Sequence, residues 1–127
     1  MSARKAILTI SLANHLHGTP IQGQLDSEWA MKTSSETRER FDNVGFDLDP
    51  ADLVPLYRVL AERTWDGVLI GWCSRGYPER TELFENVVDA CAEEIREGKG
   101  MKLLFCTGPT NLVEATMRSF PVNLLRL

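Results

Sequence analysis

Three short apolar runs, each followed by a turn-rich segment, constrain the fold of this chain more than any other feature. They cover residues 6–12, 68–70 and 101–106. Their apolar residues are consecutive rather than alternating, which is typical of strands covered on both faces, as in a parallel sheet. The first run follows two basic residues, as in a secretory signal, but it is short for one, and we expect a central strand there.

Helical periodicity occupies the segments between these runs. Apolar residues recur at spacings of three and four within residues 53–63, 78–97 and 111–120. Such spacing places the apolar side chains on one face of a helix, so we expect three amphipathic helices. They alternate with the strands in the rhythm of strand–helix–strand units.

The pattern is less regular between residues 13 and 49. We expect a loop over residues 14–23, a helix over 28–42 and a short edge strand over 46–48. The apolar tail, residues 122–127, is either a last strand or a contact between copies of the chain.

Strand–helix–strand units with right-handed crossovers build a three-layer α/β sandwich. With 127 residues, the chain is expected to form a single α/β domain. We expect a parallel sheet of four strands in the order 2-1-3-4, or of five if the tail adds one. This is the flavodoxin-like winding.

Charge and cysteine content exclude several function classes. The formal net charge is −4, which argues against a nucleic-acid binder and against an anionic-membrane binder. The three cysteines, Cys73, Cys91 and Cys106, show neither a disulfide framework nor a zinc-type spacing. Reduced thiols in a cytoplasmic protein are the simplest interpretation.

In an open α/β sheet, ligands bind outside the carboxyl ends of the strands, where the winding reverses. In the order 2-1-3-4 that place lies between the first and third strands. The candidate site residues in the segments after the first, third and fourth strands are Asn14, His15 and His17; Cys73, Ser74, Arg75 and Gly76; and Thr107 and Thr110.

Arg75 is the strongest single candidate, because it precedes a predicted helix and can hold a phosphate or carboxylate with two hydrogen bonds. The alternative is a surface arginine paired with Glu79 or Asp66. Cys73 could act as a nucleophile, with His15 or His17 as its base; the alternative is an inert buried cysteine.

The remaining polar candidates have structural alternatives. Thr107 and Thr110 could bind a phosphate or only cap a helix. The two histidines, two positions apart, lack an obvious third metal ligand, so no metal site is expected. Trp72 is placed to line a ligand cleft or to pack against the core. No standard nucleotide or dinucleotide motif occurs, and the cofactor is unknown.

Residues 44–118 resemble a family of short, functionally uncharacterised α/β proteins of bacteria and fungi. That family has a Gly-x-Gly-x-Arg turn after its third strand, a Leu-Phe-Glu helix, and Phe-Asn-Thr at the end of its fourth strand. The matching positions are Gly71, Arg75, Pro78, Leu83, Phe84, Glu85, Phe105, Thr107 and Pro109. Cys73 and Cys106 depart from the pattern. The resemblance implies a flavodoxin-like or Rossmann-like fold and transfers no activity.

Three function hypotheses stay open. The first is a protein that binds a small anionic molecule between the first and third strands. The second is a non-catalytic interaction module that forms a homodimer, or docks on a partner, through its apolar tail. The third is an enzyme or redox protein that depends on Cys73.

Overall fold

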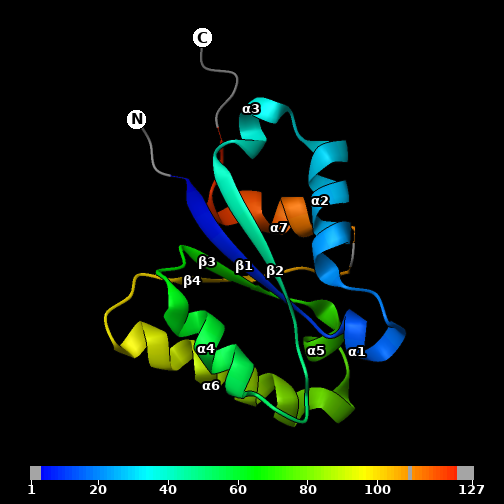
Figure 1. Cartoon of the computed structure of the whole chain (residues 1–127), viewed down its shortest axis with the longest axis vertical. Helices are drawn as coiled ribbons and strands as arrows, with labels where there is room; N and C mark the ends of the chain where they lie inside the picture. Colours follow the sequence, from blue (N-terminus) through cyan, green and yellow to red (C-terminus); the bar gives the residue numbers. More distant parts are fainter. Residues whose placement is uncertain (1–3, 109, 123–127) are drawn as a thin grey trace.

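A four-stranded parallel sheet forms the centre of the protein. The computed structural model describes residues 4–108 and 110–122. The strand order is β2-β1-β3-β4, which confirms the predicted order 2-1-3-4 (Figure 1). The strands are β1 (Lys5–Ser11), β2 (Phe41–Asp47), β3 (Gly67–Ile70) and β4 (Lys102–Phe105). A fifth strand from the tail would need residues 123–127, which lie outside the described part of the chain.

Helices cover both faces of the sheet, and this gives the predicted three layers. One face carries α2 (Ile21–Lys32) and α7 (Leu112–Ser119), and the other carries α4 (Val54–Glu62) and α6 (Thr81–Arg96) (Figure 1). One-turn elements complete the connections: α1 (Ala13–His17), α3 (Ser35–Arg38), α5 (Trp72–Arg75) and the 3₁₀ helix η1 (Pro78–Arg80). None of the helices in the described part is both long and apolar enough to span a membrane.

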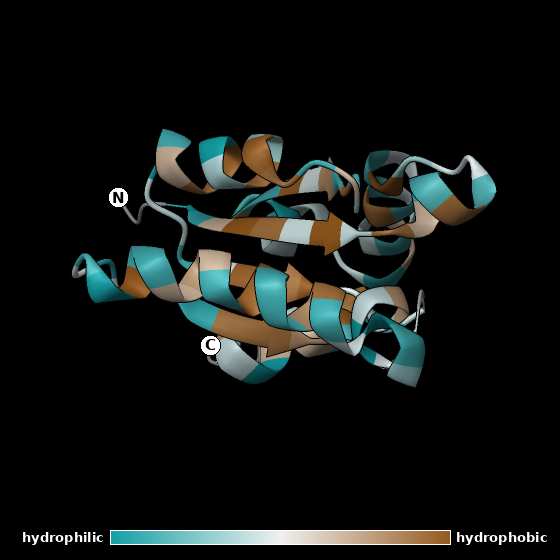
Figure 2. Ribbon diagram, turned by 90° about the horizontal axis from the view of Figure 1, so that it is seen from below, coloured by the Kyte–Doolittle hydropathy of each residue, from teal (hydrophilic) through white to brown (hydrophobic). Residues whose placement is uncertain are grey.

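The alternation of side chains along β1 divides the core into two halves. Leu8 and Ile10 point toward α4 and α6, whereas Ile7 packs with α2 and α7. Because successive side chains leave a strand on opposite faces, Thr9 and Ser11 share the face of Ile7. Burial on both sides explains the consecutive apolar run. In Figure 2 the strands are mostly brown, while the outer helices alternate brown and teal.

The segment before β2 differs from the expected loop and helix. The expected loop over residues 14–23 contains α1 and the start of α2, and the expected helix over 28–42 is the end of α2, the short α3 and the first residues of β2. The buried face of α2 consists of Ile21, Leu25, Glu28 and Trp29. Because a charged residue lies within this face, the apolar periodicity of α2 is weak.

The edge strand β2 begins five residues before its expected start, and its outer edge is partly closed. The Gln22 carboxamide accepts a hydrogen bond from the Gly45 N–H at 2.6 Å and donates one to the Asn43 carbonyl at 3.2 Å. A Cβ on Gly45 would lie 2.7 Å from Ile21 Cγ2, so glycine allows α2 to approach. Arg4 donates to the Phe41 carbonyl at 2.7 Å.

The other helices lie close to their predicted positions. Helix α4 differs from the expected range 53–63 by one residue at each end, and α7 differs by one residue at each end from 111–120. The expected helix over 78–97 is η1 followed by α6. Gly98, with φ of 91°, follows the last turn of α6 in the left-handed conformation that favours glycine.

Candidate functional site

A cavity of about 300 Å³ lies at the carboxyl ends of β1, β3 and β4, where the sheet order predicts a site. We call it the switch cavity. Its buried floor consists of Thr9, Ile10, Ser11, Ile21, Cys106 and Leu112. Its more exposed rim consists of Ala13, His17, Thr19, Trp72, Cys73 and Gly108. Gln24 and Gly71 complete the described lining.

The floor is largely apolar and carries few polar groups. Ser11 has a structural role, because its Oγ accepts a hydrogen bond from the Ala13 N–H at 3.1 Å and supports the turn into α1. The Thr9 hydroxyl is buried and has no hydrogen-bond partner within residues 4–108 and 110–122. No Lys, Arg, Asp or Glu is among the described residues that line the cavity.

Local sequence brings the walls of the cavity together. Gly71 ends β3 beside β1, and its N–H donates to the Ile10 carbonyl at 2.9 Å. A Cβ at Gly71 would lie 3.0 Å from that carbonyl oxygen, so a larger residue would push β3 away. Gly18 ends α1 with φ of 69°, and Asp47 Oδ1 accepts from the Ile21 N–H at 2.9 Å, which fixes the start of α2.

Two predicted site residues, His17 and Cys73, reach the same cavity from different segments. His17 is the last residue of α1, and Cys73 is in α5; both short helices lie at the carboxyl end of the sheet (Figure 1). His17 is exposed and Cys73 is half-buried, so both belong to the rim. Asn14 and His15 are exposed and are not part of the described lining.

Arg75 lies behind the cavity wall rather than in it. Its Nη2 donates to the Cys106 carbonyl at 2.8 Å. The guanidinium carbon lies 4.9 Å from the ring centroid of Trp72 and 5.4 Å from that of Phe105. Arg75 therefore connects α5 to the end of β4. Neither Glu79 nor Asp66, the surface partners considered from the sequence, forms an ion pair with it.

Ser74 and Gly76, the neighbours of Arg75, face the protein interior and the Trp72 ring. Ser74 is completely buried, and its Oγ has no hydrogen-bond partner in the described part of the chain. A Cβ at Gly76 would lie 2.2 Å from Cε2 of Trp72. The absence of a side chain at Gly76 thus allows the Trp72 ring to fold back over the end of α5 while it also lines the cavity. Trp72 thus lines the cavity and also packs against its neighbours, so it combines the two roles considered from the sequence.

Thr107 and Thr110 lie in the turn between β4 and α7, outside the described lining. Thr107 and Asn111 bind each other reciprocally: the Thr107 N–H donates to Asn111 Oδ1 at 3.0 Å, and Asn111 Nδ2 donates to Thr107 Oγ1 at 2.6 Å. Thr110 is exposed, and its carbonyl accepts a hydrogen bond from Lys32. These contacts hold the turn before α7, whose N-cap residue is Asn111; neither threonine caps the helix with its side chain.

Sequence reasoning missed several lining residues. Thr9 and Ser11 were part of an apolar run, and Gln24 lay beside an expected loop. One signal was present: Thr9 and Ser11 are the two hydroxyl residues at alternating positions of β1, so both lie on one face. Cys106 is buried, yet it lines the cavity. Cys91 is core, and burial raises the pKa of its thiol to about 12.

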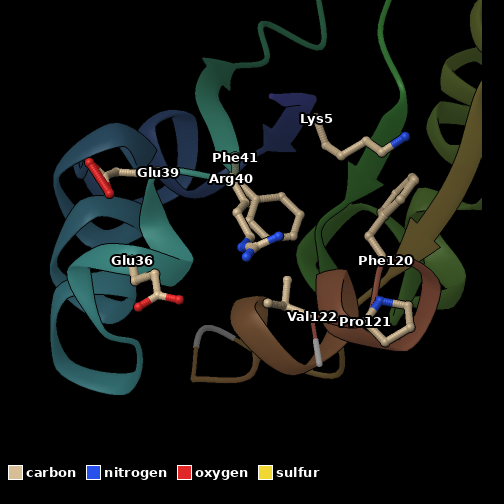
Figure 3. Close-up of a pocket in the computed structure, with 8 residues that line it drawn as sticks. All are labelled: Lys5, Glu36, Glu39, Arg40, Phe41, Phe120, Pro121 and Val122. Carbon is tan, nitrogen blue, oxygen red and sulfur yellow. The ribbon is translucent and has the colours of Figure 1, made fainter. Parts of the chain in front are cut away.

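A second depression, of about 480 Å³, lies at the opposite end of β1 and β2. It is lined by Lys5, Glu36, Glu39, Arg40, Phe41, Phe120, Pro121 and Val122 (Figure 3). Two basic and two acidic side chains balance each other there. Phe41 is the one fully buried residue among the eight, and Figure 3 shows the side chains spread around an open centre. The depression is thus a surface feature, whereas the switch cavity reaches into the core.

Within residues 4–108 and 110–122, no three His, Cys, Asp or Glu side chains are grouped as a metal site requires. Comparison with protein-family models, curated proteins and solved structures finds no match for this chain. The function must therefore be argued from the geometry of the switch cavity.

Proposed function

We propose that this protein binds a small molecule in the switch cavity. One observation carries the proposal: the cavity occupies the crevice at the carboxyl ends of β1, β3 and β4 and extends to buried strand residues. Its volume of about 300 Å³ falls at the lower end of the range of ligand pockets, roughly 300–1,000 Å³. An apolar floor with a few polar groups is also typical of such sites.

The lining favours an uncharged ligand over an anionic one. A charge placed at the floor of this cavity would lose its hydration and would meet no Lys, Arg, Asp or Glu side chain among the described lining residues. Arg75, the expected anion clamp, donates to a backbone carbonyl and lies between two aromatic rings. Anion binding by Arg75 stays a prediction, and inorganic phosphate tests it in the experiment below.

The experiment is a thermal-shift measurement with Ala13→Phe. Ala13 lines the rim, so a phenylalanine there is expected to fill part of the cavity. We would compare neutral one-ring and two-ring compounds, simple carboxylates and inorganic phosphate. Because a ligand that binds only the folded state raises stability, at least one neutral compound should raise Tm by several degrees in the native protein.

The matched control is Ala61→Phe, since Ala61 is exposed on α4, which packs on the other face of the sheet. The stabilisation should survive in the control and disappear in Ala13→Phe. Equal shifts in both variants would place the binding site elsewhere. A shift caused by phosphate alone would favour the anionic ligand.

A second candidate function rests on His17 and Cys73, which line the same rim. Nucleophilic catalysis can use a thiol together with a histidine as its base. In that case the bound molecule carries an acyl group: the Cys73 sulfur bonds to the acyl carbon, the bond to the leaving group breaks, and His17 takes the thiol proton and passes it to that group. All three cysteines are free, which agrees with the proposed cytoplasmic location. The resemblance to the uncharacterised α/β family and the docking role of the tail, residues 122–127, also stay proposals.

A further inference from the structure

Thr9 carries a hydroxyl that the fold itself does not use. It lies in the middle of β1, between Gly45 of β2 and Leu69 of β3. The residue is 1% exposed, and its Oγ1 has no hydrogen-bond partner among the described residues. Among the described residues, four other buried polar atoms also lack partners, and of these five residues Thr9 alone lines the switch cavity.

An unpartnered hydroxyl in this place lowers stability. Buried polar groups lose their hydrogen bonds to water, and the loss is uncompensated when no protein group replaces it. Valine has almost the same shape, suits a β-strand and carries no hydroxyl. Valine at position 9 would therefore make the fold more stable in the absence of a ligand.

The neighbouring polar groups of the floor differ from Thr9. Ser11 Oγ already accepts a hydrogen bond from the Ala13 N–H. The Cys106 thiol is only a weak donor and tolerates apolar surroundings. Thr9 is thus the floor residue whose strong hydrogen-bonding group has no partner among the described residues, although this hydroxyl is itself buried.

From this we infer the class of ligand: an uncharged molecule of one or two rings whose buried end carries a hydroxyl, carbonyl or ring N–H that pairs with the Thr9 hydroxyl. The inference rests on the proposed function and adds the chemistry of the ligand. A cavity of roughly 150 Å³ holds one benzene ring, and the switch cavity is about 300 Å³. The lack of charged side chains in the described lining favours a neutral body.

Thr9→Val tests this inference with two pairs of matched probes. The pairs are 4-methylphenol with 1,4-dimethylbenzene, and indole with indene; within each pair one polar group is exchanged for a similar apolar one. Binding is measured by chemical shifts of backbone amides. The native protein should bind the polar member at least about tenfold more tightly, because an apolar partner leaves the hydroxyl unpaired. Thr9→Val should lose this preference.

The same variant should unfold at a higher temperature without ligand, by roughly 2–4 °C, because it buries no unpaired hydroxyl. A gain in stability together with a loss of binding preference distinguishes a ligand-binding hydroxyl from a structural one. The matched control is Thr116→Val on α7. Thr116 is also 1% exposed, but its Oγ1 donates to the Leu112 carbonyl at 3.0 Å. Thr116→Val should keep the preference of the native protein for the polar probes, and its unfolding temperature should not rise.

The outcomes separate the inference from the proposed function. If the probes bind the native protein and Thr9→Val keeps the preference for the polar members, the inference is overturned and the small-molecule site stands. If no probe shifts the amides that surround the cavity, both are overturned. If Thr9→Val does not fold, Thr9→Ser should keep the preference and Thr9→Ala should lose it; equal behaviour of these two overturns the inference.

Discussion

The guanidinium of Arg75 joins the end of β4 to α5 through one carbonyl and two aromatic rings. At the scale of single residues, such a side chain contributes to stability and cannot be removed without loss. A hydrogen bond from a charged group contributes about 1.5–3 kcal/mol, and a cation–π contact contributes about 0.5–1 kcal/mol at exposed sites.

We therefore expect Arg75→Ala to lower the free energy of unfolding by about 2 kcal/mol. Arg75→Lys should recover less than half of the loss, because an ammonium lacks the planar fork of the guanidinium. Urea denaturation with a shared slope measures both values. Unchanged stability of Arg75→Ala, combined with loss of a phosphate-dependent stabilisation, would instead support the anion clamp expected from the sequence.

The three cysteines should differ widely in reactivity. Burial and, secondarily, Glu94 raise the pKa of Cys91 to about 12, so its reactive thiolate form is rare at pH 8. Cys73 lies at the exposed rim of the switch cavity. We expect Cys73 to react with iodoacetamide first and Cys91 last, as measured by peptide mass spectrometry at pH 8.

A cavity ligand provides the control for this labelling experiment, since it should slow the modification of Cys73 and leave that of Cys91 unchanged. If Cys73 is modified no faster than Cys91, catalysis that depends on Cys73 loses its support.

At the scale of elements, α2 and α7 are joined by a buried carboxylate. Glu28 is 5% exposed, and its Oε1 accepts a hydrogen bond from the Val113 N–H, in the first turn of α7, at 3.0 Å. Lys32 lies 3.7 Å from the same oxygen and also pairs with Glu114 on α7 at 3.0 Å. One helix thus supplies the cap for the other.

Glu28→Ala should lower the free energy of unfolding by about 1–3 kcal/mol, because it leaves the Val113 N–H without its partner. Glu28→Gln keeps an oxygen acceptor and should retain more of that stability. Faster amide exchange at Val113 in Glu28→Ala would identify the cap as the cause. The exposed Glu36→Ala is the control, with an expected change within about 0.5 kcal/mol.

The same carboxylate explains why α2 could not be predicted from the sequence. A helix that buries Glu28 beside Leu25 and Trp29 has a polar residue on its inner face, so its periodicity is lost. The partner that makes this burial favourable, the Val113 N–H, lies 85 residues away in the chain. A local pattern cannot contain such information. For the same reason the amino half of β2, with Asp42 and Asn43 at the sheet edge, did not resemble a strand.

At the scale of the whole molecule, the strand order and the place of the cavity could be predicted. Both follow from the three apolar runs and the right-handed crossover rule. The residues that line the cavity could not be predicted, because they depend on the directions in which side chains leave α1 and α5. These one-turn helices direct His17 and Cys73 to the cavity while His15 stays outside it and Arg75 lies behind its wall. Thr9 and Ser11 carried a weaker signal in their shared face of β1.

The carboxamide of Gln22 has one more consequence. It occupies the backbone groups of Asn43 and Gly45 that a strand from another chain would use to extend the sheet. Addition of strands at an open edge is a first step toward fibrous aggregates. The docking of α2 therefore protects the protein against polymerisation at β2. Detachment of this helix would free these backbone groups, and a strand from another chain could then pair with β2.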